Sequence, residues 1–200
     1  MLRRQALNMK LGIVSDIHAN PGALRRAFDL MGDVDRWICL GDCINQFRFS
    51  NEVVRELRDR DVCTIWGNHE EVFFSAQGMR ARAEDWIEPE LLIWLSRQQK
   101  RRELQLEGKR VLLVHSTPWE SGGAYILPSS SEFKRFGEVA ADIVMYGHIH
   151  CPVATRVAGT LVINPGSTGE GRPTSQGFIS SCAVLDLESE AVEHFDFIAD

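Results

Sequence analysis

The first third of the chain alternates short apolar runs with helical segments, and this order restricts the folds open to it. The strand-like runs cover residues 10–15, 36–40 and 62–66, and the helical segments between them cover residues 21–31 and 50–60. Asn20 followed by Pro21 is a typical helix start, with Asn as the N-cap and Pro in the first turn. Because strand-helix-strand connections are right-handed, we expect parallel strands whose carboxyl ends share one edge of a sheet.

Polar residues follow each of these apolar runs directly. They are Asp16, His18, Asp42, Asn68 and His69. Open α/β sheets bind their ligands at the carboxyl ends of the strands, so these side chains are expected to face one site. For the first two residues taken alone, capping or turn chemistry is the alternative interpretation.

A second group of histidines follows later strand-like runs. His115 ends the run 110–114, and Gly147-His148-Ile149-His150 follows the run 143–146. In an extended backbone, residues two positions apart face the same way. This geometry predicts that His148 and His150 share one cavity, and likewise that Asp16 and His18 point to the same side. Gly147 lets the chain turn there. A lone His-x-His pair is a weak signal, and the other strand-end ligands strengthen it.

The remaining segments complete a two-sheet α/β pattern. We expect helical structure over 71–100, a hairpin of 103–106 and 110–114, a loop over the site at 116–131, a helix over 131–140 capped by Ser131, and antiparallel strands at 153–157, 161–163, 178–187 and 191–198. The turn Asn164-Pro165-Gly166-Ser167 is expected to turn its backbone amides toward an anion. The parallel N-terminal half and the antiparallel C-terminal half would then form two sheets packed face to face, with helices outside.

Length and composition favour one domain, residues 1–200. The 200 residues with 44% hydrophobic content can bury one sizeable core. The net charge of −6 argues against stable nucleic-acid binding. With no apolar h-region near the N-terminus and no run of about 18 apolar residues, we expect a cytoplasmic protein without membrane attachment. Met9 is an alternative start, which would make residues 1–8 an extension.

The donor types indicate divalent metal. Five of the six histidines follow apolar runs, and with carboxylate and amide oxygens they suit Mn, Fe, Zn or Co. The donors are too many for one tetrahedral zinc ion. They fit two ions roughly 3.5–4 Å apart that share a bridging carboxylate.

The chain resembles the calcineurin-like metallophosphoesterase superfamily in its motifs, which occur in the same order as in that family and cover nearly the whole chain. The motifs are Asp16-x-His18, Gly41-Asp42, Gly67-Asn68-His69-Glu70, His115 and Gly147-His148-x-His150. Ser15 to Asn20 and the turn 164–167 are most similar to small bacterial and archaeal phosphodiesterases. The resemblance implies a four-layer αββα sandwich of two mixed β-sheets flanked by helices. It implies a first ion on Asp16, His18, Asp42 and His150, and a second on Asp42, Asn68, His115 and His148.

The implied activity is metal-dependent phosphoester hydrolysis by in-line attack of a hydroxide that bridges two metal ions, manganese being expected and Fe, Zn, Co or Ni being alternatives. His69 is the candidate to protonate or stabilise the leaving oxygen, and a supporting role without proton transfer is its alternative. Ser167, Arg48 and Arg172 are candidates for substrate binding, although a solvated surface position is the ordinary state of an arginine.

One departure bears on the substrate. Where the protein-phosphatase branch has an Asp and an Arg after the Gly-Asp block, this chain has Asn45 and Gln46. Asn cannot stabilise an imidazolium as a carboxylate does, which favours a phosphodiesterase acting on a small-molecule phosphoester or nucleotide. A phosphomonoesterase, a protein phosphatase, or a protein-binding scaffold of the same fold, as in a retromer subunit, are the alternatives. Homo-oligomerisation is left open.

Overall fold

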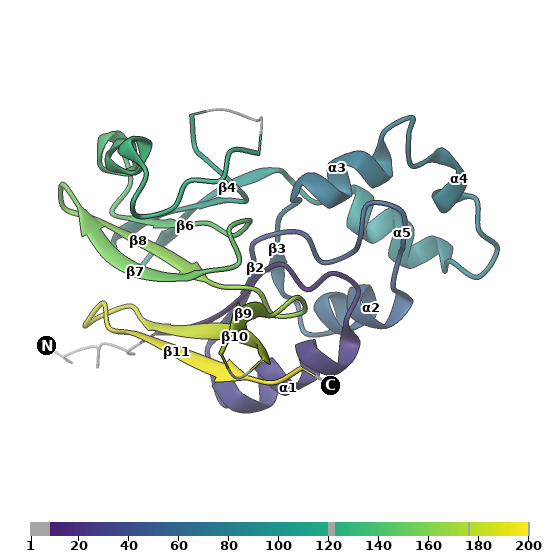
Figure 1. Ribbon diagram of the computed structural model, residues 1–200, viewed down its shortest axis with the longest axis horizontal. Coiled ribbons are helices and arrows are strands. Elements are labelled where there is room, and N and C mark those ends of the chain that lie inside the picture. Colours follow the sequence, from purple (N-terminus) through teal and green to yellow (C-terminus); the bar gives the residue numbers. More distant parts are fainter. Residues whose placement is uncertain (1–8, 120–122, 176, 200) are drawn as a thin grey trace, which may run out of the picture.

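The computed structural model describes residues 9–119, 123–175 and 177–199 (Figure 1). Residues 1–8, on which the alternative start at Met9 depends, and residues 120–122 of the expected loop lie outside this description. The elements in chain order are β1 (Lys10–Val14), α1 (Pro21–Met31), β2 (Arg36–Cys39), α2 (Asn51–Asp59), β3 (Cys63–Thr64), α3 (Asn68–Phe74), α4 (Met79–Arg82), α5 (Pro89–Ser96), β4 (Arg101–Leu106), β5 (Lys109–Val114), the 3₁₀ helix η1 (Ser131–Glu138), β6 (Ile143–Met145), β7 (Pro152–Val157), β8 (Thr160–Pro165), β9 (Arg172–Thr174), β10 (Gly177–Asp186) and β11 (Val192–Phe197).

The strands form two mixed sheets, as expected. The first has the order β11-β10-β1-β2-β3, with β9 paired to β10, and the second has the order β4-β5-β6-β8-β7. The β1-β2 and β2-β3 pairs are parallel, which confirms the arrangement predicted for the N-terminal third. The hairpin of β4 and β5 is also confirmed.

The expectation of a separate antiparallel C-terminal sheet was wrong. The β7-β8 hairpin joins the second sheet, where β8 runs parallel to β6, while β10 and β11 extend the first sheet through an antiparallel pair of β10 with β1. The register places Leu185 opposite Leu11 and Ala183 opposite Ile13. These four side chains are buried between the sheets, so the apolar face of β10 is covered only when the strand lies beside β1.

The core between the sheets consists of alternate residues from both. Ile13, Ile38 and Leu40 from the first sheet are fully buried together with Leu113 and Met145 from the second. Because side chains alternate across a strand, the other residues of β1 and β5 face the outer layers. The two sheets therefore bury their inner faces against each other and leave their carboxyl-terminal ends close together.

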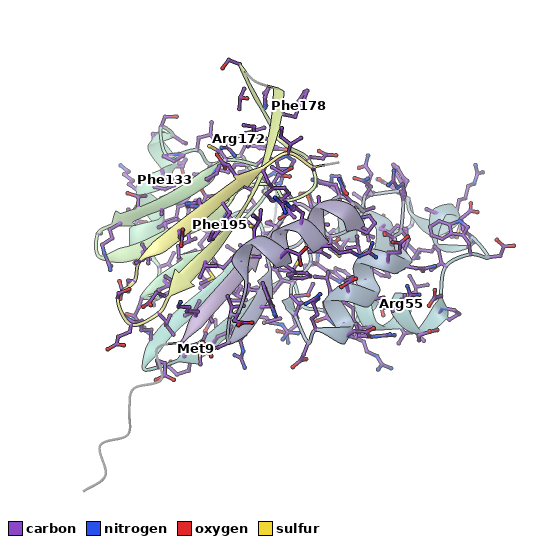
Figure 2. The ribbon with its side chains drawn as sticks, turned by 90° about the horizontal axis from the view of Figure 1, so that it is seen from below. Met9, Arg55, Phe133, Arg172, Phe178 and Phe195 are labelled. Carbon is purple, nitrogen blue, oxygen red and sulfur yellow. The ribbon has the colours of Figure 1, made fainter. Side chains whose placement is uncertain are left out.

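Helices cover the outer face of the first sheet. Figure 2 shows α1 lying across its strands, and α1 packs Leu24 and Phe28 against Trp37 and Cys182 in one cluster that also includes residues of α2 and α5. The predicted start of α1 is confirmed, since Asn20 Oδ1 accepts a hydrogen bond of 3.0 Å from the N–H of Ala23.

The outer layer over the second sheet is a 3₁₀ helix, where an ordinary helix over 131–140 was expected. Its N-cap is Ser130, whose hydroxyl accepts from the N–H of Glu132, so the prediction of Ser131 as the cap was wrong. Phe133 and Phe136 are three residues apart, and with three residues per turn both rings point at the sheet. Both are buried in the cluster that includes Val144.

The expected helical stretch at 71–100 consists of three short helices. Of these, α3 begins at Asn68, earlier than predicted, and α4 and α5 follow after turns. In Figure 1 these helices lie at one end of the sandwich. No helix of the described residues is long and apolar enough to span a membrane.

Candidate metal centre

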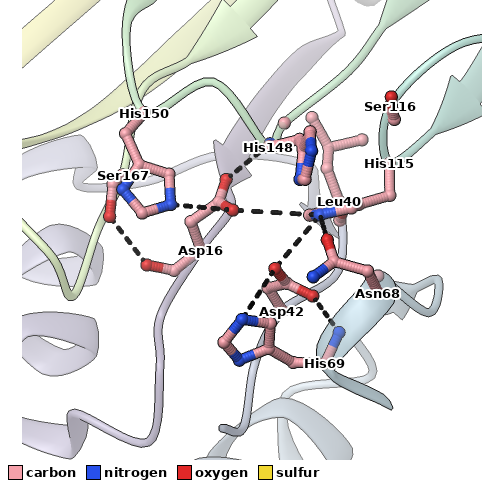
Figure 3. Close-up of polar contacts among 12 residues, drawn as sticks. Asp16, Leu40, Asp42, Asn68, His69, His115, Ser116, His148, His150 and Ser167 are labelled. Carbon is pink, nitrogen blue, oxygen red and sulfur yellow. Dashed lines mark hydrogen bonds and ion pairs between the residues drawn. The ribbon is translucent and has the colours of Figure 1, made fainter. Parts of the chain in front are cut away.

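The expected polar residues converge where the carboxyl ends of the two sheets meet (Figure 3). The first sheet supplies Asp16 and His18 after β1, Asp42 after β2, and Asn68 and His69 at the start of α3. The second sheet supplies His115 after β5 and His148 and His150 after β6. Residues that are far apart in the sequence, such as Asp16 and His148, which are 132 positions apart, therefore share one site.

The backbone that holds these residues is not extended. Left-handed φ angles of 52°, 49°, 50°, 67° and 54° occur at Asp16, His18, Asp42, His148 and His150. The prediction that each pair faces one way because of extended geometry was wrong, although the pairs do converge. Non-glycine residues rarely adopt this region, and such strain persists only where surrounding contacts impose it.

Two glycines allow the strand-end loops to approach closely. A Cβ on Gly41, where φ is 94°, would lie 2.4 Å from the backbone nitrogen of Gly67. A Cβ on Gly147 would lie 2.0 Å from the hydroxyl oxygen of Ser15. The first contact joins the ends of β2 and β3, and the second joins β6 to β1 across the two sheets. The site therefore depends on two positions that accept only glycine without rearrangement.

Asp42 lies at the centre of the cluster and is 2% exposed. Its Oδ1 accepts a hydrogen bond of 2.8 Å from the N–H of His69, and its Oδ2 lies 3.1 Å from His115 Nε2. Burial opposes ionisation of this carboxyl, but the His115 charge and the hydrogen bonds from both histidines lower its pKa below the usual range. Asp42 is therefore an ionised carboxylate.

Asp16 is fully buried, and its two oxygens differ. Oδ2 accepts a hydrogen bond of 3.0 Å from the N–H of His148. Oδ1 has no hydrogen-bond donor among the described residues, and His150 Nε2 lies 3.3 Å from it. Against the effect of burial, His150 and His115 lower the pKa of Asp16. An ionised oxygen without a donor in a buried site is a place for a cation.

Two backbone carbonyls determine the tautomers of two histidines. His115 Nδ1 lies 2.8 Å from Leu40 O, and His148 Nε2 lies 2.7 Å from Gly123 O. A carbonyl oxygen only accepts, so each of these ring nitrogens carries a proton. The opposite nitrogens, His115 Nε2 and His148 Nδ1, are then the ones that would bind metal ions, His115 Nε2 after releasing the proton it shares with Asp42, and the carbonyls fix the orientation of the rings.

The remaining histidines lie with their rings together. His18 Nε2 and His150 Nε2 are 3.2 Å apart, and the His18 and His69 ring centroids are 4.6 Å apart. Nδ1 of His18 and Nδ1 of His69 are buried without a hydrogen-bond partner among the described residues. Burial lowers the pKa of His18, so its ring is neutral and offers a lone pair.

The donor atoms fall into three sets whose members lie within 4.8 Å of one another: Asp16, His18 and His150; His18, Asp42 and His69; and Asp42, His115 and His148. The first and last sets resemble the expected division between two ions. In addition, Asn68 Oδ1 lies 3.0 Å from His115 Nε2. Imidazole and carboxylate donors at this spacing, with buried atoms that lack partners, fit divalent metal.

Glu70 supports the site, a role that the motif alone did not reveal. Its fully buried carboxylate accepts hydrogen bonds from the N–H groups of Asp42 at 2.8 Å, Gly67 at 2.7 Å and Ile44 at 3.1 Å. Burial and then the Asp42 charge raise its pKa. An acidic residue at the third position of a helix is the sequence signal of an N-terminal cap, but here the carboxylate also holds the β2 loop.

The turn at 164–167 supports the end of β1. The Ser167 hydroxyl donates to Asp16 O at 2.9 Å and accepts from the N–H of Glu170, and Ser167 is buried. Among the amides expected to face an anion, the N–H of Gly166 instead donates to the side chain of Asn164, whose Nδ2 in turn donates to Gly147 O. This segment therefore links the ends of β1, β6 and β8.

The two arginines expected near substrate make protein contacts in this structure. Arg48 donates to the carbonyl of Ala19 at 3.2 Å. Arg172 pairs with Asp196 at 2.6 Å and is the first residue of β9 in the projecting β9-β10 hairpin, whose Phe178 is also labelled in Figure 2. A role of either arginine, or of Ser167, in substrate binding stays a prediction.

Comparison with known proteins gives one family. Residues 9–190 match the profile of the calcineurin-like phosphoesterase superfamily domain. The uncharacterized protein MJ0912 of Methanocaldococcus jannaschii is 26% identical over 81% of this chain and 77% of its own length. A metallophosphoesterase from Sphaerobacter thermophilus has a similar fold, with a TM-score of 0.77, 22% identity and coverage of 96% and 88% of the two chains. An archaeal phosphodiesterase also has a similar fold, with a TM-score of 0.62, 23% identity and coverage of 94% of this chain and 100% of the phosphodiesterase chain.

Proposed function

Because the chain belongs to the calcineurin-like phosphoesterase superfamily, we propose that it is a metal-dependent phosphodiesterase that hydrolyses small-molecule esters. The observation that carries the proposal is the burial of the Asp16 and Asp42 carboxylates among imidazoles whose free nitrogens face them. One carboxylate oxygen without a donor and two rings oriented by carbonyls form a site prepared for cations. Phosphodiester cleavage needs such a concentration of positive charge.

Two sets of residues would hold the ions. Asp16, His18 and His150 would hold one, Asn68, His115 and His148 the other, and Asp42 would contact both. When bound, two divalent ions supply charge neutralisation for the phosphoryl oxygens and a water of lowered pKa as the nucleophile. Manganese is our first expectation. The carbonyls of Leu40 and Gly123 keep two of the rings oriented during the reaction.

His69 is placed to act on the leaving group. Its backbone N–H is bonded to Asp42, its side chain is 23% exposed, and its Nε2 lies 3.9 Å from Asp42 Oδ2. The ring therefore lies at the solvent-facing side of the carboxylate cluster. From there an imidazolium can give its proton to the departing alkoxide oxygen, which lowers the barrier to P–O bond cleavage.

The preference for diesters is supported by Asn45. Its side chain donates to the backbone carbonyl of His18 at 3.2 Å, so it braces the β1 loop. Asn45 therefore supplies a neutral amide where the protein-phosphatase branch has an Asp that orients the histidine. The lack of that carboxylate weakens the case for phosphoprotein chemistry and leaves a small diester the favoured substrate.

The test is hydrolysis of bis-p-nitrophenyl phosphate and p-nitrophenyl phosphate by metal-stripped protein after addition of Mn, Ni, Co, Zn or Mg. We expect metal-dependent cleavage that favours the diester and is lost in Asp42→Asn. Much faster cleavage of the monoester would indicate a phosphomonoesterase. Bound metal without turnover of either ester would indicate a binding scaffold.

A further inference from the structure

We propose that a cavity beside Asn68 and His115 binds the nucleoside part of a nucleotide substrate, with its base against Trp66 and Trp119. The inference rests on the proposed function, because it names the class of ester that the site would cleave. The cavity has a volume of about 440 Å³, within the ordinary range for small-molecule sites.

The cavity is continuous with the metal centre. Asn68 and His115 belong to the donor cluster and also line the cavity, together with residues of the segment after β5. In Figure 3 Ser116 lies beyond His115, on the side away from Asp42. A ligand in the cavity can therefore extend its phosphate to the cluster while its remaining part stays between α3 and the β4-β5 hairpin.

Two indoles in the cavity wall are held in place by protein contacts. Trp66 stacks on Phe74 with ring centroids 4.8 Å apart and an angle of 5° between the planes, and its Nε1–H donates to Leu95 O at 2.7 Å. Trp119 packs edge-to-face on Phe136 at 5.0 Å and under the guanidinium of Arg135 at 4.4 Å. Fixed aromatic rings lose little entropy when a flat base stacks on them.

Two cationic side chains, Lys100 and Arg101, and one carboxylate, Glu71, line the same cavity. Lys100 Nζ pairs with Glu71 at 3.1 Å, and Arg101 pairs with Glu103 at 2.7 Å. The cationic side chains are 58% and 47% exposed, so both pairs are solvated and contribute little to stability. With Glu71 counted, the lining has an excess of one positive charge in a protein whose net charge is −6, which favours an anionic ligand.

These features together indicate a ligand that is both flat and anionic. Inorganic phosphate or a sugar phosphate would use the cations and leave the indoles in water. A neutral aromatic molecule would use the indoles and leave the cations. A nucleotide satisfies both, since its base stacks and its phosphate is attracted to the cations and to the metal centre.

The experiment measures binding of 5′-AMP and ribose 5-phosphate to the full-length protein by calorimetry, in the presence of a chelator so that no turnover occurs. The two probes differ only in the base. We expect AMP to bind at least about fivefold more tightly, the lower end of the effect of one stacked base. Absence of AMP binding, or equal affinity for both probes, contradicts the proposal.

Variants test the indoles and the cations of the cavity wall separately. Trp119→Ala should weaken AMP about fivefold or more and leave ribose 5-phosphate unchanged, while Trp119→Phe, which keeps a ring, should retain most AMP binding. The matched control is Trp86→Ala, because Trp86 is 49% exposed and lines a different cavity. The same AMP affinity in Trp119→Ala and Trp86→Ala overturns the assignment.

Lys100→Ala should weaken both probes to a similar extent, with Lys134→Ala, an exposed lysine on η1, as the control. Since binding is measured without metal, these results do not depend on hydrolysis. Diester hydrolysis without nucleotide preference would remove this inference and leave the phosphodiesterase proposal standing. AMP binding at Trp119 in a protein that hydrolyses no ester would support this inference and remove the phosphodiesterase proposal.

Discussion

The carboxylate of Glu70 accepts a hydrogen bond of 2.8 Å from the backbone N–H of Asp42, in the turn where Asp42 has a left-handed φ of 50°. The second carboxylate oxygen accepts from Ile44 N–H and Cys43 Sγ. One buried side chain thus imposes the strained turn that presents the central carboxylate.

Glu70→Gln is expected to weaken this turn. An amide NH₂ would replace one oxygen and face backbone donors, leaving a buried N–H unsatisfied at a cost of about 1–3 kcal/mol in the free energy of unfolding. Manganese affinity should fall about 10- to 100-fold, the usual effect of disturbing a group that orients ligands. Urea unfolding and calorimetry measure both. Glu132→Gln, an exposed residue on η1, is the control, and equal behaviour of the two variants would rule out the role of Glu70.

The His115 pKa predicts how stability depends on pH in metal-free protein. Although burial lowers it, Asp42 and the other partners raise the pKa of His115 from 6.5 to about 10. The folded state therefore binds this proton more tightly than the unfolded chain. The resulting stabilisation is complete below pH 6.5 and is lost as pH rises toward 10.

Urea unfolding at several pH values, with and without His115→Asn, checks this expectation. The free-energy difference between wild type and variant should shrink between pH 6.5 and 10. A difference that stays constant with pH would contradict the assignment.

His69→Gln separates proton transfer from a supporting role. If His69 protonates the leaving oxygen, kcat should fall about 100- to 10,000-fold while two metal ions remain bound. Esters with good leaving groups should be affected least. A small loss of kcat that is the same for esters with good and poor leaving groups would leave His69 only a supporting role.

Ser167→Ala tests whether this residue binds substrate. Its hydroxyl bonds Asp16 O and Glu170 N–H, but Asp16 O also accepts from Gly169 N–H at 3.0 Å. We therefore expect a loss of about 1 kcal/mol in stability and little change in KM. A large rise in KM at unchanged stability would show that Ser167 contacts substrate, as the sequence suggested.

The sequence predicted which strand ends carry the site because local patterns determine them. Asn20-Pro21 starts a helix, and the apolar run before Asp42 forms a strand, both of which the adjacent residues indicate by themselves. The allocation of β10 to the first sheet was not predictable in this way, since it depends on pairing residues about 170 positions apart, such as Leu11 with Leu185.

Contacts within the site also join residues far apart in the sequence, so local patterns could not predict them. Hydrogen bonds such as His148 N–H to Asp16, or His148 Nε2 to Gly123 O, form only after both sheets are in place. The left-handed φ at His148 follows from these contacts and not from its own preference, which is why extended geometry was the wrong expectation.

Titration of metal-stripped protein with Mn²⁺, while bis-p-nitrophenyl phosphate hydrolysis is followed in the same sample, tests the central claim most directly. The account predicts that activity rises until about two equivalents are bound, as two ions sharing Asp42 require. Hydrolysis that is complete at one equivalent, or no hydrolysis with two ions bound, would contradict it.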